Sequence, residues 1–354
     1  MICKICLNDN SVRNISFNSD GICCFCEKYE KIKDKLNDQS TLSSLFEQRV
    51  EKVRGNYDYD AAVGISGGKD SVYVLYRLAK DYGLHIRAFT MDNGFLSTKA
   101  RENIDRVVSQ LGVEHEYIEF DMKKLQRFYH YSMKKWLVPC IACSYIGYAS
   151  MVNYASRINA GMVVHGRSPA QMIRFYDKDI YSELIKPGLL PPEDTDISGL
   201  YSSLLKNIEK KMDRDIMLDV REMLMKDTNE KDLREFVAFF LYHPYNENKI
   251  VDFLRKEVGW NPPEDYDHYD CTIHNAARYI YQKAEGRPHS LPEISSLIRM
   301  GELTRQEGSR MLGSLIIKEK PVNELDSLLN FADINENMLF LKAKLYSLQL
   351  RLNN

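Results

Sequence analysis

A short glycine-rich turn between an apolar strand and a helix constrains this chain more than any other feature. Residues 61–65 (AAVGI) predict a buried strand, and a helix opens at Val72. Between them lie small and polar residues, namely Ser66, Gly67, Gly68, Lys69, Asp70 and Ser71. Two glycines let the backbone approach an anion, the serines offer hydroxyl donors, Lys69 adds a cation, and the helix N-terminus directs N–H groups at the same point. The turn therefore predicts a phosphate site.

The turn is too short to be a Walker A loop, which has a longer spacing between its first glycine and its Gly-Lys pair. It resembles instead the PP-loop of the ATP pyrophosphatases, which cleave ATP between the α and β phosphates. The resemblance implies ATP and Mg²⁺ as ligands and adenylation as the reaction, with AMP placed on a substrate oxygen and pyrophosphate released. It also implies a catalytic set of Lys69, Asp70 and Ser71, in which Lys69 stabilises charge and Asp70 holds magnesium or orders the loop. A glycine turn with incidental polar side chains is the alternative.

Strand and helix patterns alternate between residues 60 and 170, which is typical of a doubly wound parallel sheet. The resemblance makes this α/β fold adenine nucleotide alpha hydrolase-like. We expect strands at 61–65, 86–91, 116–120 and 162–166, and helices at 72–81, at 98–111 and from near Cys143. Ligands bind at the carboxyl ends of the strands in such sheets.

Several polar residues follow the expected strands and are candidates for that edge. Asp92 can hold magnesium or a ribose hydroxyl, or form a turn. Gly166 and Arg167 follow another strand, and Arg167 and Arg174 can bind phosphate or a carboxylate, or lie on the surface. The nearby histidines are expected to be structural: His165, His268 and His274.

The C-terminal half reads as almost wholly helical. The expected helices span 200–212, 233–241, 247–258, 274–285, 291–300, 304–315 and 335–352, after a proline-rich stretch at 186–192. Residues 29–53 read as a polar helix. We therefore expect a cysteine-rich module at 1–30, a helical connector at 31–57, an ATP-binding domain at 58–190 and a helical region at 191–354.

Two Cys-x-x-Cys pairs near the N-terminus predict a zinc knuckle. Each pair can place two thiolates on one ion, and both together complete a tetrahedral, structural site. The pairs consist of Cys3, Cys6, Cys23 and Cys26, with Cys24 as a spare. Free cysteines in a flexible terminus are the alternative.

Three further cysteines lie in or near the expected active edge. Cys140 and Cys143 precede a helix, and Cys271 opens another one far downstream. If they converge, the open fourth position suits a [4Fe–4S] cluster with a free iron, or a zinc ion. Burial as small apolar side chains is the alternative.

Charge and hydropathy exclude some classes of protein. There are 48 Lys and Arg against 50 Asp and Glu, a net charge of -2, so no global basic field indicates a nucleic-acid partner. No run approaches the roughly twenty apolar residues of a membrane span, and the N-terminus lacks a signal-peptide pattern. We therefore expect a soluble, cytoplasmic protein, in which cysteines are reduced or bind metals.

The whole layout resembles the N-acetyl sugar amidotransferase family of bacterial surface-glycan synthesis. The resemblance rests on the features above and on motifs at 20–26 (DGICCFC), 139–143, 257–260 (EVGW), 270–271, 286–287 and 298–308. Residues 167–170 (RSPA) replace a more acidic segment of the family. The resemblance implies that an acetamido group of a free or nucleotide-linked sugar is adenylated and attacked by ammonia. A partner glutaminase would supply the ammonia.

PP-loop tRNA thiolation enzymes share the loop, terminal zinc knuckles and three cysteines on an iron–sulfur cluster. Resemblance to them implies that sulfur from a donor protein replaces the adenylated oxygen instead. The low basic charge argues against a large RNA partner, although a zinc knuckle can read RNA. A third alternative is a nucleotide sensor without turnover.

Overall fold

The computed structural model describes residues 1–12, 15–31, 33–168, 170, 209–224, 234–261 and 270–352. A five-stranded parallel sheet lies at its centre, in the order β3-β2-β1-β4-β5. The strands are β1 (Tyr59–Gly64), β2 (Ile86–Met91), β3 (Glu114–Ile118), β4 (Ala160–His165) and β5 (Glu235–Ala238). The expected doubly wound α/β fold is confirmed.

The burial of β1 and β4 agrees with their inner positions in the sheet. All six residues of β4 are buried, as are the four central residues of β1, because both strands are covered on both faces. The chain runs from β1 through β2 to β3 on one side, and β4 pairs with the other side of β1. The carboxyl ends of β1 and β4 therefore border the point where the winding direction reverses, which is where such sheets bind ligands.

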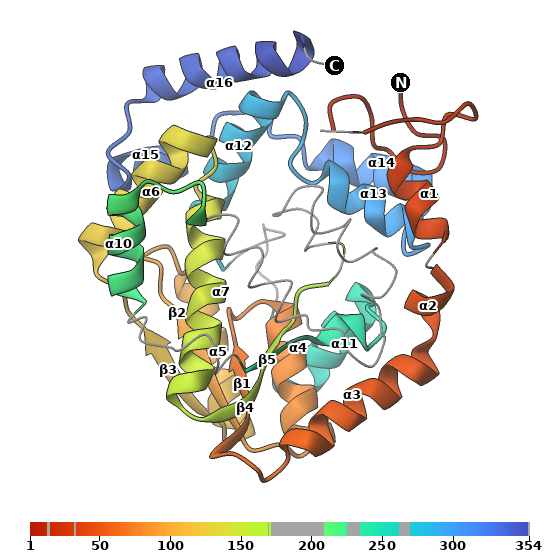
Figure 1. Ribbon diagram of the computed structural model, residues 1–354, viewed down its shortest axis with the longest axis vertical. Helices are drawn as coiled ribbons and strands as arrows, with labels where there is room; N and C mark the ends of the chain where they lie inside the picture. The colour runs from red at the N-terminus through yellow and green to blue at the C-terminus, as the bar shows by residue number, and fades with distance from the viewer. Residues whose placement is uncertain are drawn as a thin grey trace.

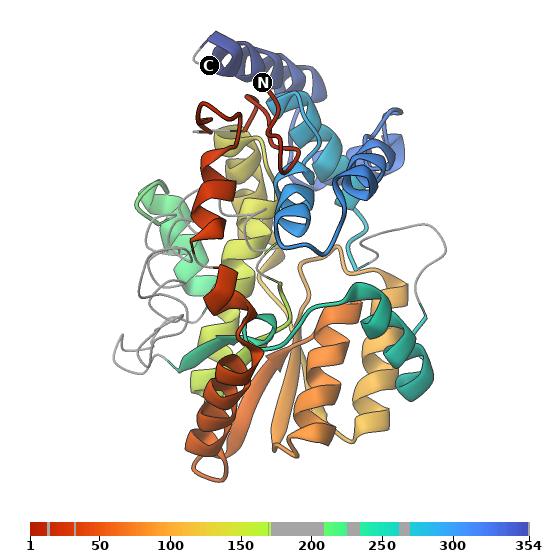
Figure 2. The ribbon, with the colours of Figure 1, turned by 90° about the vertical axis from the view of Figure 1, so that its right-hand side faces the viewer.

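Helices cover both faces of the sheet. Figure 2 shows α4 (Lys69–Tyr76) and α5 (Thr98–Leu111) on one face and α7 (Cys140–Arg157) on the other. The ring of Tyr154 in α7 packs against Phe89 of β2, with centroids 4.5 Å apart. A short π-helical segment, Arg77–Asp81, continues α4.

The C-terminal helices lie beyond the sheet, towards the top of Figure 1. The helices that carry Ile280 and Leu328 share a core with α6 (Met122–Trp136) and α7, to which Phe128 also belongs. The helices of the second half are α10 (Arg214–Met223), α11 (Glu247–Val258), α12 (His274–Glu285), α13 (Leu291–Arg299), α14 (Arg305–Ser314), α15 (Val322–Phe331) and α16 (Glu336–Leu352). A helical C-terminal region is confirmed. None of the helices in the described parts of the chain has both the length and the apolar character that crossing a bilayer requires.

The prediction of a helix over 233–241 is wrong. Residues Glu235–Ala238 form β5, and Phe239–Leu241 form a short 3₁₀ helix. The run FVAFFL is apolar at every position, and such a run fits a buried parallel strand as well as a buried helix. The sheet thus takes a strand from beyond residue 190, where we expected its domain to end.

Other boundaries differ by smaller amounts. The strand expected at 116–120 is Glu114–Ile118, and the helix expected from Val72 begins at Lys69. The polar helix expected over 29–53 consists of the end of α1 (Cys24–Glu30), α2 (Lys33–Asn37) and α3 (Gln39–Val53). Asp38 separates the last two, because its carboxylate accepts the Thr41 N–H at 3.1 Å and caps α3. Arg174, His268, the stretch 186–192 and most of 200–212 lie outside the described residues.

Candidate functional site

The glycine-rich turn lies at the carboxyl end of β1 and is closed by its own serines. Ser71 Oγ accepts the Ser66 N–H at 3.1 Å and donates to the Gly68 carbonyl at 3.0 Å. Gly67 has a φ of +77°, and a Cβ there would lie 2.5 Å from the Ala100 carbonyl oxygen of α5. Only glycine fits this backbone, which therefore forms a tight cradle at the N-terminus of α4.

The turn after β4 touches the same cradle. A Cβ on Gly166 would lie 2.7 Å from the Asp70 carbonyl oxygen and 3.1 Å from the Ser71 nitrogen. The two turns thus meet backbone to backbone. Next to Gly166, the buried His165 accepts the Arg167 N–H on Nδ1 at 3.1 Å. Burial and then the Arg167 charge lower the pKa of His165 to about 3, so its ring is neutral.

Trp260 holds the far side of the turn. Its buried indole Nε1–H donates to the Gly67 carbonyl at 3.0 Å, across 193 residues of chain. The sequence marked Trp260 only as part of a motif after a helix. Nothing in the sequence around Trp260 predicted this contact with the turn.

Lys69 lies in an acidic environment. Its Nζ is 3.4 Å from Glu247 Oε1 and 3.7 Å from Asp70 Oδ2. Burial lowers the pKa of Lys69, but the charges of Asp70 and Glu247 outweigh it, so the pKa is raised above its ordinary value. Lys69 is thus a fixed cation at the helix N-terminus. The sequence did not single out Glu247, the first residue of α11.

Carboxylate oxygens are the ligands that Mg²⁺ prefers, and it usually takes one or two of them together with substrate phosphates. Asp70 offers such a group at the rim of the turn, 3.7 Å from Lys69. Asp92 is engaged elsewhere: its carboxylate accepts from Arg101 at 2.5 Å and from the Gly94 N–H at 3.0 Å. Asp70 is therefore the better placed of the two for a metal next to the turn.

The segment before α12 reaches the sheet edge by pairing with the loop after β2. Leu96 and Cys271 form an isolated antiparallel β-bridge. On either side of it, the Ser97 N–H donates to the Asp270 carbonyl at 3.2 Å, and the Thr272 N–H donates to the Phe95 carbonyl at 2.8 Å. The Asp270 side chain is half-buried and hydrogen-bonded to Ser66. Burial raises the pKa of this carboxyl, although the hydrogen bond from Ser66 opposes the shift.

Cys140, Cys143 and Cys271 gather around Tyr129, whose pKa all three raise after the larger effect of burial. Asn93 Nδ2 donates to Cys143 Sγ at 3.2 Å. Burial raises the pKa of Cys143 and Cys271. The three sulfurs do not all lie within 4.8 Å of one another, although all three residues are described. The side chains share one neighbourhood without forming a closed ligand cage.

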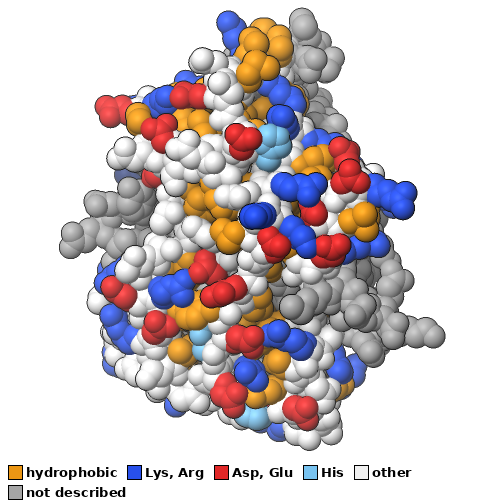
Figure 3. All heavy atoms as spheres, turned by 90° about the vertical axis from the view of Figure 1, so that its left-hand side faces the viewer, with side chains coloured by type: hydrophobic (Ala, Val, Ile, Leu, Met, Phe, Trp, Pro, Cys, Tyr) orange, Lys and Arg blue, Asp and Glu red, His pale blue; other side chains and the backbone are white. Residues whose placement is uncertain are grey.

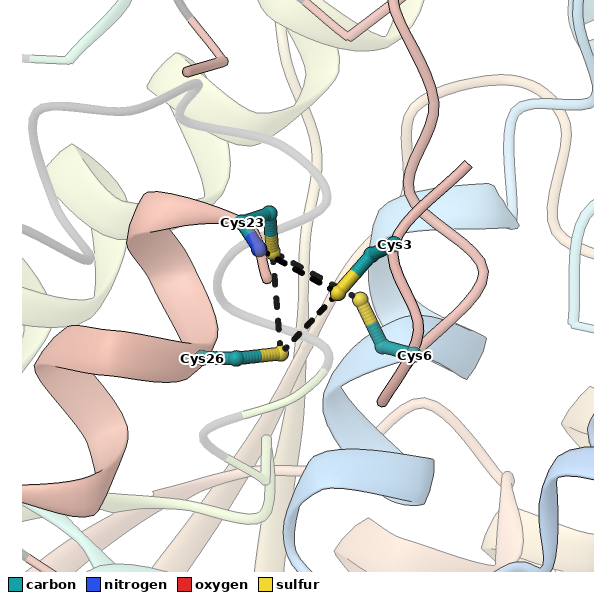
Figure 4. Close-up of side chains that lie close together, drawn as sticks. All are labelled: Cys3, Cys6, Cys23 and Cys26. Carbon is teal, nitrogen blue, oxygen red and sulfur yellow. Dashed lines mark hydrogen bonds between the residues drawn. The ribbon is translucent and has the colours of Figure 1, made fainter. Parts of the chain in front are cut away.

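The four N-terminal cysteines do form such a cage, and all four are buried (Figure 4). Three of the Sγ–Sγ distances are 3.6, 3.7 and 3.8 Å. Four thiolates at about 2.3 Å from a tetrahedral zinc ion would be about 3.8 Å apart. The sulfur atoms are thus spaced for a zinc ion and too far apart for disulfides. Cys23, and not Cys24, completes the set.

The cysteine module is fixed to the C-terminal helices. Arg299 Nε of α13 donates to Cys26 Sγ at 3.5 Å, and Arg305 donates to the carbonyls of Cys3 and Cys6. Leu7 N–H donates to Ser295 Oγ at 3.3 Å. A guanidinium beside a thiolate offsets the negative charge that four thiolates leave on a zinc ion.

Comparisons with known proteins give distant similarities. No family model matches the chain. A glutamine-hydrolysing GMP synthase from Pyrobaculum aerophilum is 26% identical over 103 residues, which cover 29% of this chain and 20% of that relative. The chain therefore matches only about a fifth of the length of this curated relative.

Two solved structures are similar at low identity. An NH3-dependent NAD synthetase from Campylobacter jejuni is 16% identical, with a TM-score of 0.31, over 54% of this chain and 95% of that one. The U34-tRNA thiolase NcsA from Methanococcus maripaludis, solved with its [4Fe-4S] cluster, is 14% identical, with a TM-score of 0.36, over 95% of this chain and 98% of that one.

Proposed function

We propose that the chain is a PP-loop ATP pyrophosphatase that adenylates a carbonyl or amide oxygen of a small substrate and releases pyrophosphate. The observation that carries the proposal is the glycine cradle at the carboxyl ends of β1 and β4, with the Lys69 cation at its rim. The partial similarity to a GMP synthase agrees with this chemistry. The site residues are those of the turn, together with Gly166 and Arg167.

The turn would act by binding and orienting the triphosphate. Backbone N–H groups at the start of α4 point towards the cradle and would hold phosphate oxygens. Lys69, kept charged by Asp70 and Glu247, would stabilise the negative charge that develops on the departing pyrophosphate. Magnesium, held by Asp70, would neutralise further phosphate charge.

The second half-reaction we propose is amidation. An amide oxygen is a poor leaving group, and once it is adenylated AMP leaves in its place while ammonia attacks the carbon. The order of motifs in the sequence favours an acetamido sugar as substrate, with ammonia supplied by a partner glutaminase. The relative from Pyrobaculum aerophilum is itself named as glutamine-hydrolysing.

Sulfur transfer is a second candidate, and the cysteines around Tyr129 favour it. Cys140, Cys143 and Cys271 offer three thiolates beside the loop after β2, which suits a [4Fe–4S] cluster with one open iron. The ligand sulfurs of a [4Fe–4S] cube lie about 6.4 Å apart. Sulfurs that do not all lie within 4.8 Å of one another therefore argue against a single-ion site and leave a cluster site open.

Pyrophosphate release tests the proposed adenylation. Purified protein is given ATP, Mg²⁺ and a panel of acetamido sugars and nucleotide sugars, and substrate-dependent pyrophosphate is measured. We expect Lys69→Ala to lower the rate about 10² to 10³-fold, and Lys99→Ala, which removes an exposed lysine on α5, to leave it unchanged. Full activity in Lys69→Ala would contradict the proposal.

Iron content separates the two candidates. Protein purified without oxygen is assayed for iron and for absorbance near 400 nm, beside Cys271→Ser. Iron that the variant loses would favour sulfur transfer, and protein without iron that aminates its substrate would favour amidation.

A further inference from the structure

Helix α16 presents a row of apolar side chains to solvent. Four large side chains are between 47% and 67% exposed: Met338, Leu341, Leu345 and Leu348. At about 100° per residue, they share an arc of roughly 80° on one side of the helix. Leu339 and Ala343 lie on the opposite side and are buried against the core. We call the four exposed side chains the α16 seam.

The spacing of the seam is that of a coiled coil. Intervals of three, four and three residues place Met338 and Leu345 at a positions and Leu341 and Leu348 at d positions. The helix lies at the top edge of the molecule in Figure 1, and apolar side chains gather at the top of the surface in Figure 3. A second helix therefore has access to the seam.

The helix is already held in place for such a partner. Phe340 packs on Tyr279 of α12, with ring centroids 5.8 Å apart, and Lys342 donates to the Lys134 carbonyl of α6. A short isolated pair of helices is marginal because each must first become ordered. Here one of the two helices is ordered by the core, so this cost falls on the partner alone.

Charge determines which helix fits. Lys342 and Lys344 occupy e and g positions beside the seam, and residues 337–352 contain no acidic side chain. A second copy of α16 would oppose basic residues with basic or neutral ones and would form no attractive e/g pair. We propose that the α16 seam docks an amphipathic helix of another protein, with acidic side chains flanking its apolar face.

A synthetic helix tests this inference independently of the catalytic proposal. The probe is a peptide of about three heptads with leucine at a and d and glutamate at e and g, and the control peptide has lysine at e and g. Binding to the full chain is followed by fluorescence anisotropy. We expect the glutamate peptide to bind and the lysine peptide to bind at least about tenfold more weakly.

Variants locate the binding site. Leu341→Ser with Leu345→Ser should weaken glutamate-peptide binding about tenfold or more. Leu218→Ser, which removes a similarly exposed leucine of α10, should not. Lys344→Glu should reduce the difference in affinity between the glutamate peptide and the lysine peptide. Equal binding of both peptides, or no binding of either, would overturn the proposal. So would a dimer, seen by light scattering, that dissociates when Leu341 and Leu345 are replaced, because the seam would then bind a second copy of this chain.

Discussion

The indole Nε1–H of Trp260 donates to the carbonyl oxygen of Gly67 at 3.0 Å. In a planar trans peptide the C=O and the following N–H point in opposite directions. Holding the Gly67 carbonyl against the buried Trp260 therefore turns the Gly68 N–H to the other side of the turn, where Ser66 Oγ lies 3.4 Å away. The tryptophan fixes the direction of a donor that it does not touch.

Trp260→Phe keeps an aromatic ring and removes only the N–H donor. A hydrogen bond of this kind contributes about 1 kcal/mol, so pyrophosphate and ATP should bind roughly fivefold to tenfold more weakly. Titration calorimetry measures both. Trp136→Phe changes the other tryptophan, in α6, and should bind like the unaltered protein. Unchanged pyrophosphate affinity in Trp260→Phe would show that the orientation of the Gly67–Gly68 peptide does not depend on the hydrogen bond from Trp260.

Gly166→Ala should disturb the contact between the turns after β1 and β4. The new Cβ would lie 2.7 Å from the Asp70 carbonyl oxygen, which is backbone and cannot simply rotate away. We expect a loss of about 1 to 3 kcal/mol in the free energy of unfolding, together with weaker ATP binding. Gly313→Ala, a helical glycine with no atom within 4 Å of the added Cβ, is the control and should be neutral or stabilising. Equal unfolding midpoints for the two variants would contradict the close approach of Gly166 to the Asp70 backbone.

Zinc should be present in freshly purified protein and should depend on the four-cysteine cage. We expect Cys6→Ser to lose zinc by elemental analysis and to lower the free energy of unfolding by more than about 2 kcal/mol. Cys24→Ser, next to a ligand but outside the cage, should keep both zinc and stability. Protein that contains no zinc before any mutation would exclude the metal assignment.

His165 should make the fold sensitive to acid. Its pKa is about 3 in the folded protein and near 6.5 when unfolded, so the unfolded state binds more protons between these values. Stability is thus complete above about pH 6.5 and falls as the pH drops towards 3. The contribution lost between pH 7.5 and 5 is about 2 kcal/mol. His165→Asn, whose side-chain oxygen can accept the same Arg167 N–H, should reduce this dependence in urea denaturation; an identical pH profile would contradict it.

Local patterns in the sequence predicted most of the sheet and several helices. The strand Ile86–Met91 and the helices Glu247–Val258 and His274–Glu285 lie where hydrophobic periodicity and flanking turns indicated. Strand β5 was missed because a continuous apolar run has no period that separates a strand from a helix.

The parts of the site that come from distant segments were not predictable from one sequence. Glu247 at the start of α11 and Trp260 just after its end both reach the turn, and nothing in their local sequence indicates that they do. The four-cysteine cage was predictable because its ligands are close in sequence. Its docking on Arg299 and Arg305 was not, because those contacts span almost the whole chain. The roles of the turn residues and the domain boundaries stay predictions.

The docking of the cysteine module also orders events during synthesis. Cys3 and Cys6 leave the ribosome long before Arg305, which binds their carbonyls from 302 and 299 residues further along the chain. The module can take up its metal long before it docks, because its four ligands all lie within residues 3–26. It can dock only after α13 and α14 have been made, since these helices contribute Arg299 and Arg305. A chain that stops before α13 would therefore carry a loaded but undocked module, recognisable by zinc that chelators remove quickly.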